Sequence, residues 1–397
     1  MSNTANSEPK KRIYLDHAAS TPVGAAARAA MARAAGLRGN PSSIHAEGRE
    51  AQALLAESRA RAAAVVGAAP GEIVFTGSGS EADALALHGA AYARRALGRH
   101  LVVSSIEHKA VLKAAEALAR EGFEVSYAVP GQDGTVLPQT IGKLLRNDTT
   151  LVSVMYANNE VGTVEPVKEI AALVHARSRA LVHTDACQAP GQLSVNADEL
   201  GVDLMSLNSS KVYGPKGAGA LYVRRGVMLE PLVGGEQERG LRGGTESVEL
   251  TLGFAAALEE AETLRAQEAP RLSALRDLLI AEIEKRIPDA QLNGHRTRRL
   301  PNNVHVSIPA IEGEAMLLML DAAGVACATG SACNSFDLAP SHVLLALGAE
   351  AALAHGSVRL TLGRETTQAE VRFAARELAR VVGVLKSISA LTAPALV

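Results

Sequence analysis

Short runs of β-branched and apolar residues alternate with alanine-rich stretches through residues 70–225, and this alternation constrains the fold more than any other feature. The apolar runs are continuous, so each predicted strand is expected to be covered on both faces. Helical stretches such as 81–97, 109–121 and 167–179 separate them and predict crossovers between parallel strands. The last two runs are joined by a Gly/Pro-rich link too short for a helix, which predicts an antiparallel pair. The seven predicted strands are 72–76, 100–105, 124–129, 150–157, 180–186, 203–208 and 219–224.

The pattern changes after residue 250. A long helical stretch over 251–286 leads to two strand-like runs, NNVHVSIP and SVRLTLG, separated by helical segments. This arrangement predicts a smaller α+β lobe beside a large α/β domain. The predicted fold class is therefore α/β, with a mostly parallel seven-stranded sheet and helices on both faces. We assign residues 20–262 to the large domain, and residues 1–19 and 263–397 to the small domain.

Composition argues against several classes of function. The 397 residues carry a formal net charge of −2 and no long basic run, which disfavours direct nucleic-acid binding. The basic cluster HRTRR (295–299) is interpreted as a solvated turn. No apolar stretch reaches the roughly 18 to 20 residues of a membrane span, and the polar first dozen residues lack the apolar core of a secretory signal. A soluble, cytoplasmic protein is expected. Three cysteines without a CxxC pair fit neither a disulfide framework nor a structural zinc site, so no metal is expected.

Polar residues follow the predicted strands at the positions where the strands end. In an open α/β sheet, ligands bind in the crevice outside the carboxyl ends of the strands, so these side chains are expected to converge on one site. The residues at these strand ends are Thr76, Gly77, Ser78, Gly79, Ser80, Glu107, His108, Asn158, Asn159, Glu160, Asp185, Gln188, Ser209, Ser210 and Lys211.

The stretch GSGSEADALAL (77–87) is a glycine-rich turn that opens a helix. Its free N–H groups and the positive end of the helix dipole suit a phosphate group. The same letters fit the dinucleotide pattern G-x-G-x-x-A, with Glu107 at the end of the next strand. Such a motif usually begins its domain, whereas this one follows some 70 residues. An ordinary turn between a strand and a helix is the third interpretation.

Lys211 and Asp185 acquire a joint meaning beside this turn. Taken singly, Lys211 is typical of a surface charge, and Asp185 of a helix cap or a core carboxylate. Together they meet the needs of a pyridoxal phosphate enzyme. The lysine forms a Schiff base with the cofactor, the carboxylate keeps the pyridine nitrogen protonated, and the helix N-terminus holds the phosphate.

The chain resembles the cysteine desulfurases of the NifS/IscS-like group, within the class V aminotransferase family of fold-type I pyridoxal phosphate enzymes. The resemblance extends over nearly all of residues 13–385. Its motifs are YLDHAASTPV (14–23), GNPSSIHAEGR (39–49), IEHKAVL (106–112), MYANNEVGTVEP (155–166), HTDACQAPG (183–191), KVYGPKGAGALYVRR (211–225), ERGLRGGT (238–245), GSACNSFDLAPSHVLLALG (330–348) and SVRLTLGRETT (357–367).

The resemblance implies a role for each predicted site residue. Lys211 would carry the cofactor, Asp185 would pair with its ring nitrogen and Gln188 with its ring hydroxyl. His108 would stack over the ring and take part in proton transfer. The other implied contacts are Gly79, Ser80 and Ser210 at the phosphate, Thr245 at the phosphate of a second subunit in a homodimer, Asn158 at the cofactor and the substrate carboxylate, and Arg359 at that carboxylate.

The resemblance also assigns the three thiols. Cys333 lies in a Gly/Ser-rich segment and would attack the sulfur of cofactor-bound cysteine as a thiolate. No Lys or Arg is adjacent to it in sequence, and a buried structural cysteine is the alternative. Cys327 is the rival thiol and is interpreted as core packing, and Cys187 is interpreted as part of the floor of the cofactor site.

The implied reaction converts L-cysteine to L-alanine and leaves a persulfide on the enzyme for a sulfur-acceptor protein, as in iron–sulfur cluster assembly. Two departures from the family pattern stand out. Ser209 and Ser210 replace the usual Gly-His pair before the lysine, which weakens one phosphate contact by ~1 to 2 kcal/mol. The phosphate turn reads TGSGSEADAL where relatives resemble TSGATESNNL. The alternatives are a selenocysteine lyase, another class V lyase or epimerase, and a weakly active scaffold in a sulfur-transfer complex.

Overall fold

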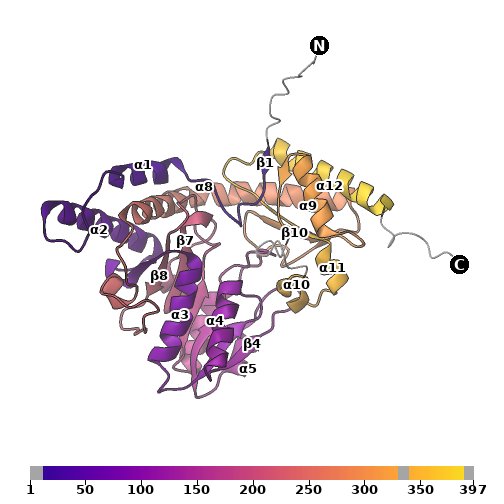
Figure 1. The fold of residues 1–397 in the computed structure, drawn as a ribbon. Coiled ribbons are helices and arrows are strands. Elements are labelled where there is room, and N and C mark those ends of the chain that lie inside the picture. The colour runs from indigo at the N-terminus through magenta and orange to yellow at the C-terminus, as the bar shows by residue number, and fades with distance from the viewer. Residues whose placement is uncertain (1–11, 330–338, 389–397) are drawn as a thin grey trace, which may run out of the picture. The chain divides into compact units, whose positions relative to one another are not determined.

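The computed structural model describes residues 12–329 and 339–388, which form two compact units (Figure 1). The larger unit comprises Ala18–Ala269 and Gly294–Leu300. The smaller unit comprises the described residues within Met1–His17, Pro270–Asn293 and Pro301–Val397. One boundary falls at Pro270 inside the long helix α8 (Val248–Arg286), where proline removes a backbone hydrogen-bond donor.

A seven-stranded sheet forms the centre of the larger unit, in the order β2-β8-β7-β6-β5-β3-β4. Strands β3 to β7 pair in parallel, and β8 is antiparallel to both of its neighbours. The predicted mostly parallel sheet and its antiparallel last pair are confirmed. The strands are β2 (Ile73–Thr76), β3 (His100–Ser104), β4 (Glu124–Ala128), β5 (Thr149–Ser153), β6 (Leu181–Asp185), β7 (Leu204–Asn208) and β8 (Gly219–Val223).

Burial explains why the strand sequences are continuously apolar. Every residue of β3, β5, β6 and β8 is buried, as expected for strands covered on both faces. The exception is β4 at the sheet edge, where Glu124 and Tyr127 are exposed.

Helices follow the strands as the sequence predicts. Helix α3 packs against β5, β6, β7 and β8, and its apolar side chains share one core with Val74, Leu101 and Leu221. The helical elements of this unit, apart from α8, are α1 (Ala25–Ala34), α2 (Ala46–Val66), η1 (Pro70–Glu72), α3 (Gly79–Ala93), α4 (Lys109–Arg120), α5 (Pro138–Leu144), α6 (Val167–Arg177), α7 (Ala197–Leu200), η2 (Ser209–Lys211) and η3 (Glu238–Gly240).

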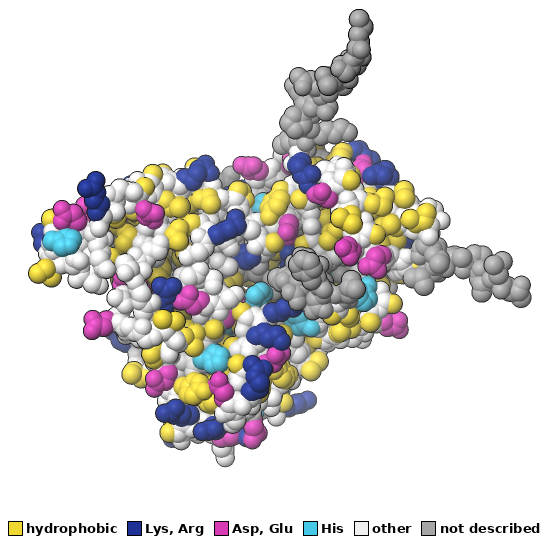
Figure 2. Space-filling view, in the orientation of Figure 1, with side chains coloured by type: hydrophobic (Ala, Val, Ile, Leu, Met, Phe, Trp, Pro, Cys, Tyr) yellow, Lys and Arg dark blue, Asp and Glu magenta, His cyan; other side chains and the backbone are white. Residues whose placement is uncertain are grey.

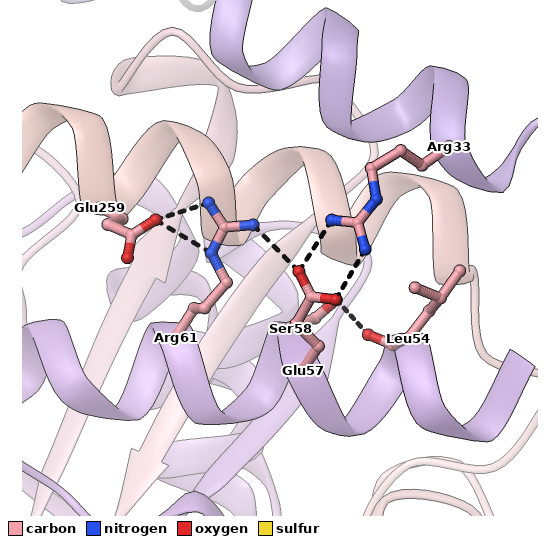
Figure 3. Close-up of polar contacts among 6 residues, drawn as sticks. All are labelled: Arg33, Leu54, Glu57, Ser58, Arg61 and Glu259. Carbon is pink, nitrogen blue, oxygen red and sulfur yellow. Dashed lines mark hydrogen bonds and ion pairs between the residues drawn. The ribbon is translucent and has the colours of Figure 1, made fainter. Parts of the chain in front are cut away.

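A chain of ion pairs connects α1, α2 and α8 (Figure 3). Arg33 of α1 donates to both carboxylate oxygens of Glu57 on α2, at 2.8 Å each. Arg61 of α2 approaches Glu57 at 3.4 Å and donates from Nε to Glu259 of α8 at 3.0 Å. These side chains are partly exposed, so each pair contributes at most about 1 kcal/mol.

The described residues of the smaller unit form two small sheets. Strands β12, β10 and β9 form an antiparallel sheet, and β1 pairs in parallel with β11. The runs NNVHVSIP and SVRLTLG are neighbours, with Val304 opposite Leu360, and both lie in a core that includes residues of α9 and α12. The elements are β1 (Ile13–Tyr14), β9 (Gln291–Leu292), β10 (Asn303–Ser307), α9 (Gly313–Ala322), β11 (Val325–Ala326), α10 (His342–Ala346), α11 (Ala351–His355), β12 (Ser357–Thr361) and α12 (Gln368–Ile388).

The interpretation of the cluster 295–299 as a solvated turn is wrong for its last arginine. Arg299 is only 4% exposed, and its Nη2 donates to the carbonyl of Val161 at 2.9 Å. Arg298 donates from Nη2 to Thr135 Oγ1 at 3.0 Å. These hydrogen bonds compensate for the burial of the guanidinium group and attach the segment to the larger unit.

The surface agrees with the near-neutral net charge of −2 (Figure 2). On the face drawn, basic and acidic side chains are interspersed among hydrophobic ones. Within the described ranges, no helix has both the length and the apolar character needed to cross a membrane.

Candidate active site

The predicted phosphate turn begins α3. Ser78 is the N-cap residue, and its Oγ accepts the Glu81 N–H at 3.1 Å. A β-carbon at Gly79 would lie 2.5 Å from Cys187 Sγ and 3.0 Å from Asn208 Cβ. Glycine is therefore required here because the helix N-terminus packs directly against the segment after β6 and the last residue of β7. This close approach leaves the first N–H groups of α3 at the sheet edge, as an anion site requires.

Glu81 and Arg242 form an ion pair beside this turn. Glu81 accepts the Gly77 N–H at 2.8 Å, and Arg242 donates from Nε to Glu81 at 2.9 Å. Arg242 thereby offsets a carboxylate that would repel a phosphate. Sequence reasoning missed both residues, although Arg242 lies inside the motif ERGLRGGT that it had identified.

Two other residues predicted to contact the phosphate are exposed: Ser80 in the turn, and Thr245, predicted to reach the phosphate of a second subunit. Ser80 is the second residue of α3, and Thr245 follows the loop that contains Arg242. Thr245 Oγ1 accepts a hydrogen bond from Asn40 Nδ2 at 3.5 Å. Their contacts with a cofactor, and the homodimer, stay predictions.

Asp185 is the last residue of β6 and is buried. Its Oδ1 accepts the Cys187 N–H at 2.9 Å. Burial, followed by the nearby charge of Asp185, raises the pKa of the Cys187 thiol well above its usual value. A protonated thiol at Cys187 supports its interpretation as an unreactive residue in the floor of the cofactor site. Gln188 donates from Nε2 to the Ala18 carbonyl at 3.1 Å.

Two further buried carboxyl groups lie near Asp185. Burial raises the pKa of Glu107 to about 8, although hydrogen bonds from Ser104 and the Met155 N–H act in the opposite direction. Burial and then the charge of Asp185 raise the pKa of Asp83 well above its usual value. Asp83 lies in the second turn of α3, so the helix that begins at the phosphate turn also contributes a neutral acid.

His183 lies on β6 of the central sheet, close to the carboxyl group of Asp83. It precedes Asp185 by two positions on β6, which puts both side chains on the same face. Its Nδ1 lies 2.9 Å from Ser153 Oγ, and its Nε2 lies 3.0 Å from Ser206 Oγ and 3.7 Å from Asp83 Oδ1. Burial lowers the pKa of His183 to about 4, so the imidazole is neutral. Alternation along β6 is the signal that could have identified it.

Lys211 ends η2, directly after β7, and donates from Nζ to the Ala19 carbonyl. Ser210 donates from its N–H and Oγ to Asn208 Oδ1, at 3.3 and 3.4 Å. The carbonyl of Ser210 accepts the N–H and hydroxyl of Thr21, at 2.8 and 3.1 Å. Residues 19–21 therefore hold the segment that presents the lysine.

His108 is the N-cap of α4, and its Nδ1 accepts the Ala110 N–H at 3.2 Å. The ring is half-buried at the carboxyl end of β3, the sheet edge at which Asp185 and Lys211 also lie. The predicted stacking and proton-transfer roles of His108 stay predictions.

Asn158 is completely buried after β5 and anchors a turn. Its Nδ2 donates to the Ile106 carbonyl at 2.9 Å and approaches Met155 Sδ at 3.3 Å. Its Oδ1 accepts the N–H groups of Glu160 and Val161, both at 2.9 Å. The Nδ2 and Oδ1 atoms of the Asn158 amide are therefore both engaged by neighbouring residues of the protein. A role at the cofactor and the substrate carboxylate stays a prediction.

Arg359 lies on β12 in the smaller unit. Its Nη2 donates to Asp16 Oδ1 at 2.9 Å, and its backbone exchanges hydrogen bonds with Ala328.

Burial raises the pKa of Cys327 to about 12, which supports its interpretation as a packing residue. Cys333, the predicted nucleophile, lies outside the described residues.

Comparisons with known proteins decide the family. A sequence profile described as "Aminotransferase class-V" matches residues 13–373. The chain is 45% identical over 382 residues to "Cysteine desulfurase IscS" of Dictyoglomus turgidum, which covers 96% of this chain and 97% of that protein. The chain belongs to the class V aminotransferase family.

Within the class V aminotransferases it is a cysteine desulfurase of the NifS/IscS-like group. A structure described as "NIFS-LIKE PROTEIN" aligns with a TM-score of 0.88 and 34% identity, over 94% of this chain and 100% of that one. A structure described as "SspA in complex with cysteine" aligns with a TM-score of 0.76 and 34% identity, over 88% and 98% of the two chains. The resemblance, the fold class and the enzyme class predicted from sequence are confirmed.

Cysteine desulfurases of this family generally use pyridoxal phosphate, and the larger unit fits that group. A helix N-terminus, a carboxylate and a lysine follow β2, β6 and β7 at the same edge of the sheet. The Oδ1 of Asp83 is buried without a hydrogen-bond partner among the described residues, and His183 beside it is neutral. The site thus provides a helix N-terminus that suits a phosphate and, in Asp185, a carboxylate that suits a cationic pyridine nitrogen.

Proposed function

We propose that the protein converts L-cysteine to L-alanine, takes the sulfur as a persulfide on Cys333, and passes it to an acceptor protein. The observation that carries this proposal is the alignment of Lys211, Asp185 and the phosphate turn at one sheet edge in a chain that is 45% identical to a cysteine desulfurase. The similar structure described as containing cysteine supports L-cysteine as the substrate.

Pyridoxal phosphate would be held by groups of the larger unit. The N–H groups of Gly79 and Ser80 and the Ser210 hydroxyl would bind its phosphate, with Thr245 contributed by a partner subunit. Asp185 would face the ring nitrogen, and Gln188 the ring hydroxyl. When bound, the cofactor supplies an electron sink for the substrate Cα.

The remaining steps belong to protein side chains. Arg359 and Asn158 bind the substrate carboxylate, and Lys211 Nζ, acting as a general base, removes the Cα proton. The thiolate of Cys333 attacks the substrate sulfur, so a sulfur–sulfur bond forms and the Cβ–sulfur bond breaks. The Cβ then gains a proton from His108 or Lys211, and Lys211 returns a proton to the Cα, which gives alanine; the two protons replace those lost from the Cys333 thiol and from the Cα. One thiol and one cysteine therefore become one persulfide and one alanine, without an external oxidant.

The proposal is tested by incubating purified protein with L-cysteine and quantifying alanine together with sulfide released by a reductant. We expect equal amounts of the two products. Cys333→Ser should keep the cofactor and lose turnover, whereas the matched control Cys327→Ser should stay close to wild type. Full turnover by Cys333→Ser would remove the assigned nucleophile. Turnover of selenocysteine but not of cysteine would indicate the lyase instead.

A further inference from the structure

The motif YLDHAASTPV contributes a carboxylate whose role the proposed reaction does not use. Strand β1 pairs with β11, and the next residue, Leu15, is hydrogen-bonded on both sides. Its N–H donates to Ala326 at 2.8 Å, and its carbonyl accepts the Thr361 N–H at 2.7 Å. Asp16 forms a parallel bridge with Thr361, two positions beyond Arg359 on β12. The backbone of the N-terminal segment therefore fixes Asp16 beside β12.

The side chain of Asp16 forms an ion pair with Arg359. The distance from Arg359 Nη2 to Asp16 Oδ1 is 2.9 Å, and the two side chains are 4% and 20% exposed. A guanidinium buried to this extent requires a compensating charge and fixed hydrogen bonds. The backbone of Arg359 is held separately by Ala328, so Asp16 acts on the orientation of the guanidinium and not on the path of the strand.

Three other titratable groups face this pair, namely Tyr14, His17 and Cys327. Burial, followed by Asp16, raises the pKa of the Tyr14 hydroxyl and of the Cys327 thiol, and Arg359 acts in the opposite direction on both. Both groups are therefore neutral near pH 7, and burial lowers the pKa of His17, so among these neighbours Asp16 provides the carboxylate that pairs with Arg359.

We propose that Asp16 is a positioning residue that orients the guanidinium of Arg359 for the carboxylate of the substrate and thereby sets the affinity for an α-amino acid. This inference depends on the proposed function, in which Arg359 binds that carboxylate. An arginine carries five donors in a rigid planar fork, so one carboxylate can fix the plane while another binds. Without Asp16 the fork loses its fixed plane, and its charge is buried without this partner.

The test compares Asp16→Asn, which keeps the shape and loses the charge, with Asp16→Ala, which loses both. Asp321→Asn is the matched control because Asp321 is an exposed carboxylate of the same unit that pairs with Arg12 at the surface. The readouts are kcat and KM for L-cysteine, and the Kd of L-alanine from the absorbance change of the loaded enzyme. L-alanine has the same carboxylate and amine but no sulfur to transfer, so its Kd reports binding alone.

We expect the Kd of L-alanine and the KM of L-cysteine to rise about 10- to 100-fold in Asp16→Ala, the value of a hydrogen bond to a charged group. Asp16→Asn should show a smaller rise in the same direction, and kcat should stay within about threefold in both, as expected for uniform binding. Asp321→Asn should match wild type. If Asp16→Ala does not fold, Asp16→Asn alone decides.

Two results would overturn the inference in different ways. If Asp16→Asn and Asp16→Ala bind L-alanine like wild type while Arg359→Lys binds it weakly, Asp16 has no positioning role and the proposed function stands. If Arg359→Lys also binds L-alanine like wild type, the carboxylate role of Arg359 in the proposed function fails as well. A fall in kcat with unchanged KM would also contradict positioning for substrate binding.

Discussion

Replacing Glu107 with glutamine tests whether the buried carboxyl group of Glu107 is protonated in the folded protein. The carboxyl group of Glu107 is completely buried, and its Oε1 accepts the Ser104 hydroxyl and the Met155 N–H. Burial raises its pKa to about 8, compared with 4.5 in water. At about 1.4 kcal/mol per pH unit, this difference corresponds to ~5 kcal/mol of folding free energy as an upper estimate.

The sign follows from which state releases the proton first. Below pH 4.5 both states hold the proton, and the contribution of Glu107 to stability is complete. Between pH 4.5 and about 8 the unfolded chain is ionised and the folded chain is not, so stability falls with rising pH. Glutamine keeps the oxygen acceptor and cannot ionise, so Glu107→Gln escapes this loss.

We therefore expect the unfolding free energy of Glu107→Gln to gain ~1.4 kcal/mol on wild type for each pH unit between about 5 and 8. The gain should level off above pH 8. The measurement is pulse proteolysis in urea at matched pH values on both proteins, because a chain of this size can aggregate in full thermal scans. All other ionisable groups are shared, so their pH dependence cancels. A difference that stays constant from pH 5 to 8 would refute a protonated Glu107 in the folded state.

Three other outcomes are expected. Arg59→Ala removes the bidentate partner of Glu238, whose side chain is 1% exposed, so the unfolding free energy measured in urea should fall by about 3–5 kcal/mol. Arg33→Ala, at the exposed pair with Glu57, should lose about 1 kcal/mol or less. Gly79→Ala puts a β-carbon 2.5 Å from Cys187 Sγ, so it should lose about 1–3 kcal/mol of unfolding free energy and bind pyridoxal phosphate more weakly. The double variant Gly79→Ala, Cys187→Ala should recover only part of this loss because Asn208 Cβ still lies 3.0 Å away, and Gly71→Ala, where the β-carbon meets open space, should show no loss. Lys211→Ala should abolish the visible absorbance of the loaded enzyme while leaving the unfolding midpoint of the apoprotein within a few degrees of wild type; an unchanged visible band would contradict the assigned attachment point.

The strands were predictable because burial on both faces leaves a local signature, a run of apolar residues such as Leu151 and Val152. The pairing of Asp16 with Arg359 was not, because the two residues are 343 positions apart and their contact depends on the path of the N-terminal segment beside β12. The burial of Arg299 was missed for a similar reason, since its acceptor, the Val161 carbonyl, lies on a distant turn.

The buried acids near Asp185 illustrate a different limit. Sequence identifies a carboxylate at the end of a strand, but whether Asp83 and Glu107 are ionised depends on how completely the packing excludes water from them. Family motifs include these positions and give no protonation state. That information came from burial and from the distances to His183 and its serine neighbours.

The Ser209-Ser210 departure from the family pattern can be explained by the same kind of packing argument. Ser209 is completely buried, and a β-carbon at Gly214 would lie 2.2 Å from its hydroxyl, so glycine at 214 makes room for serine at 209. Ser210 is fixed through its carbonyl by Thr21, a contact that any side chain at 210 would preserve. The Thr21 hydroxyl also accepts the Tyr213 N–H at 2.7 Å, so backbone groups on either side of Lys211 are held by Thr21 without using the side chain at position 210. Serine at position 210 in place of the histidine of the family pattern is therefore compatible with the observed placement of the lysine, and the loss of one phosphate contact stays a prediction.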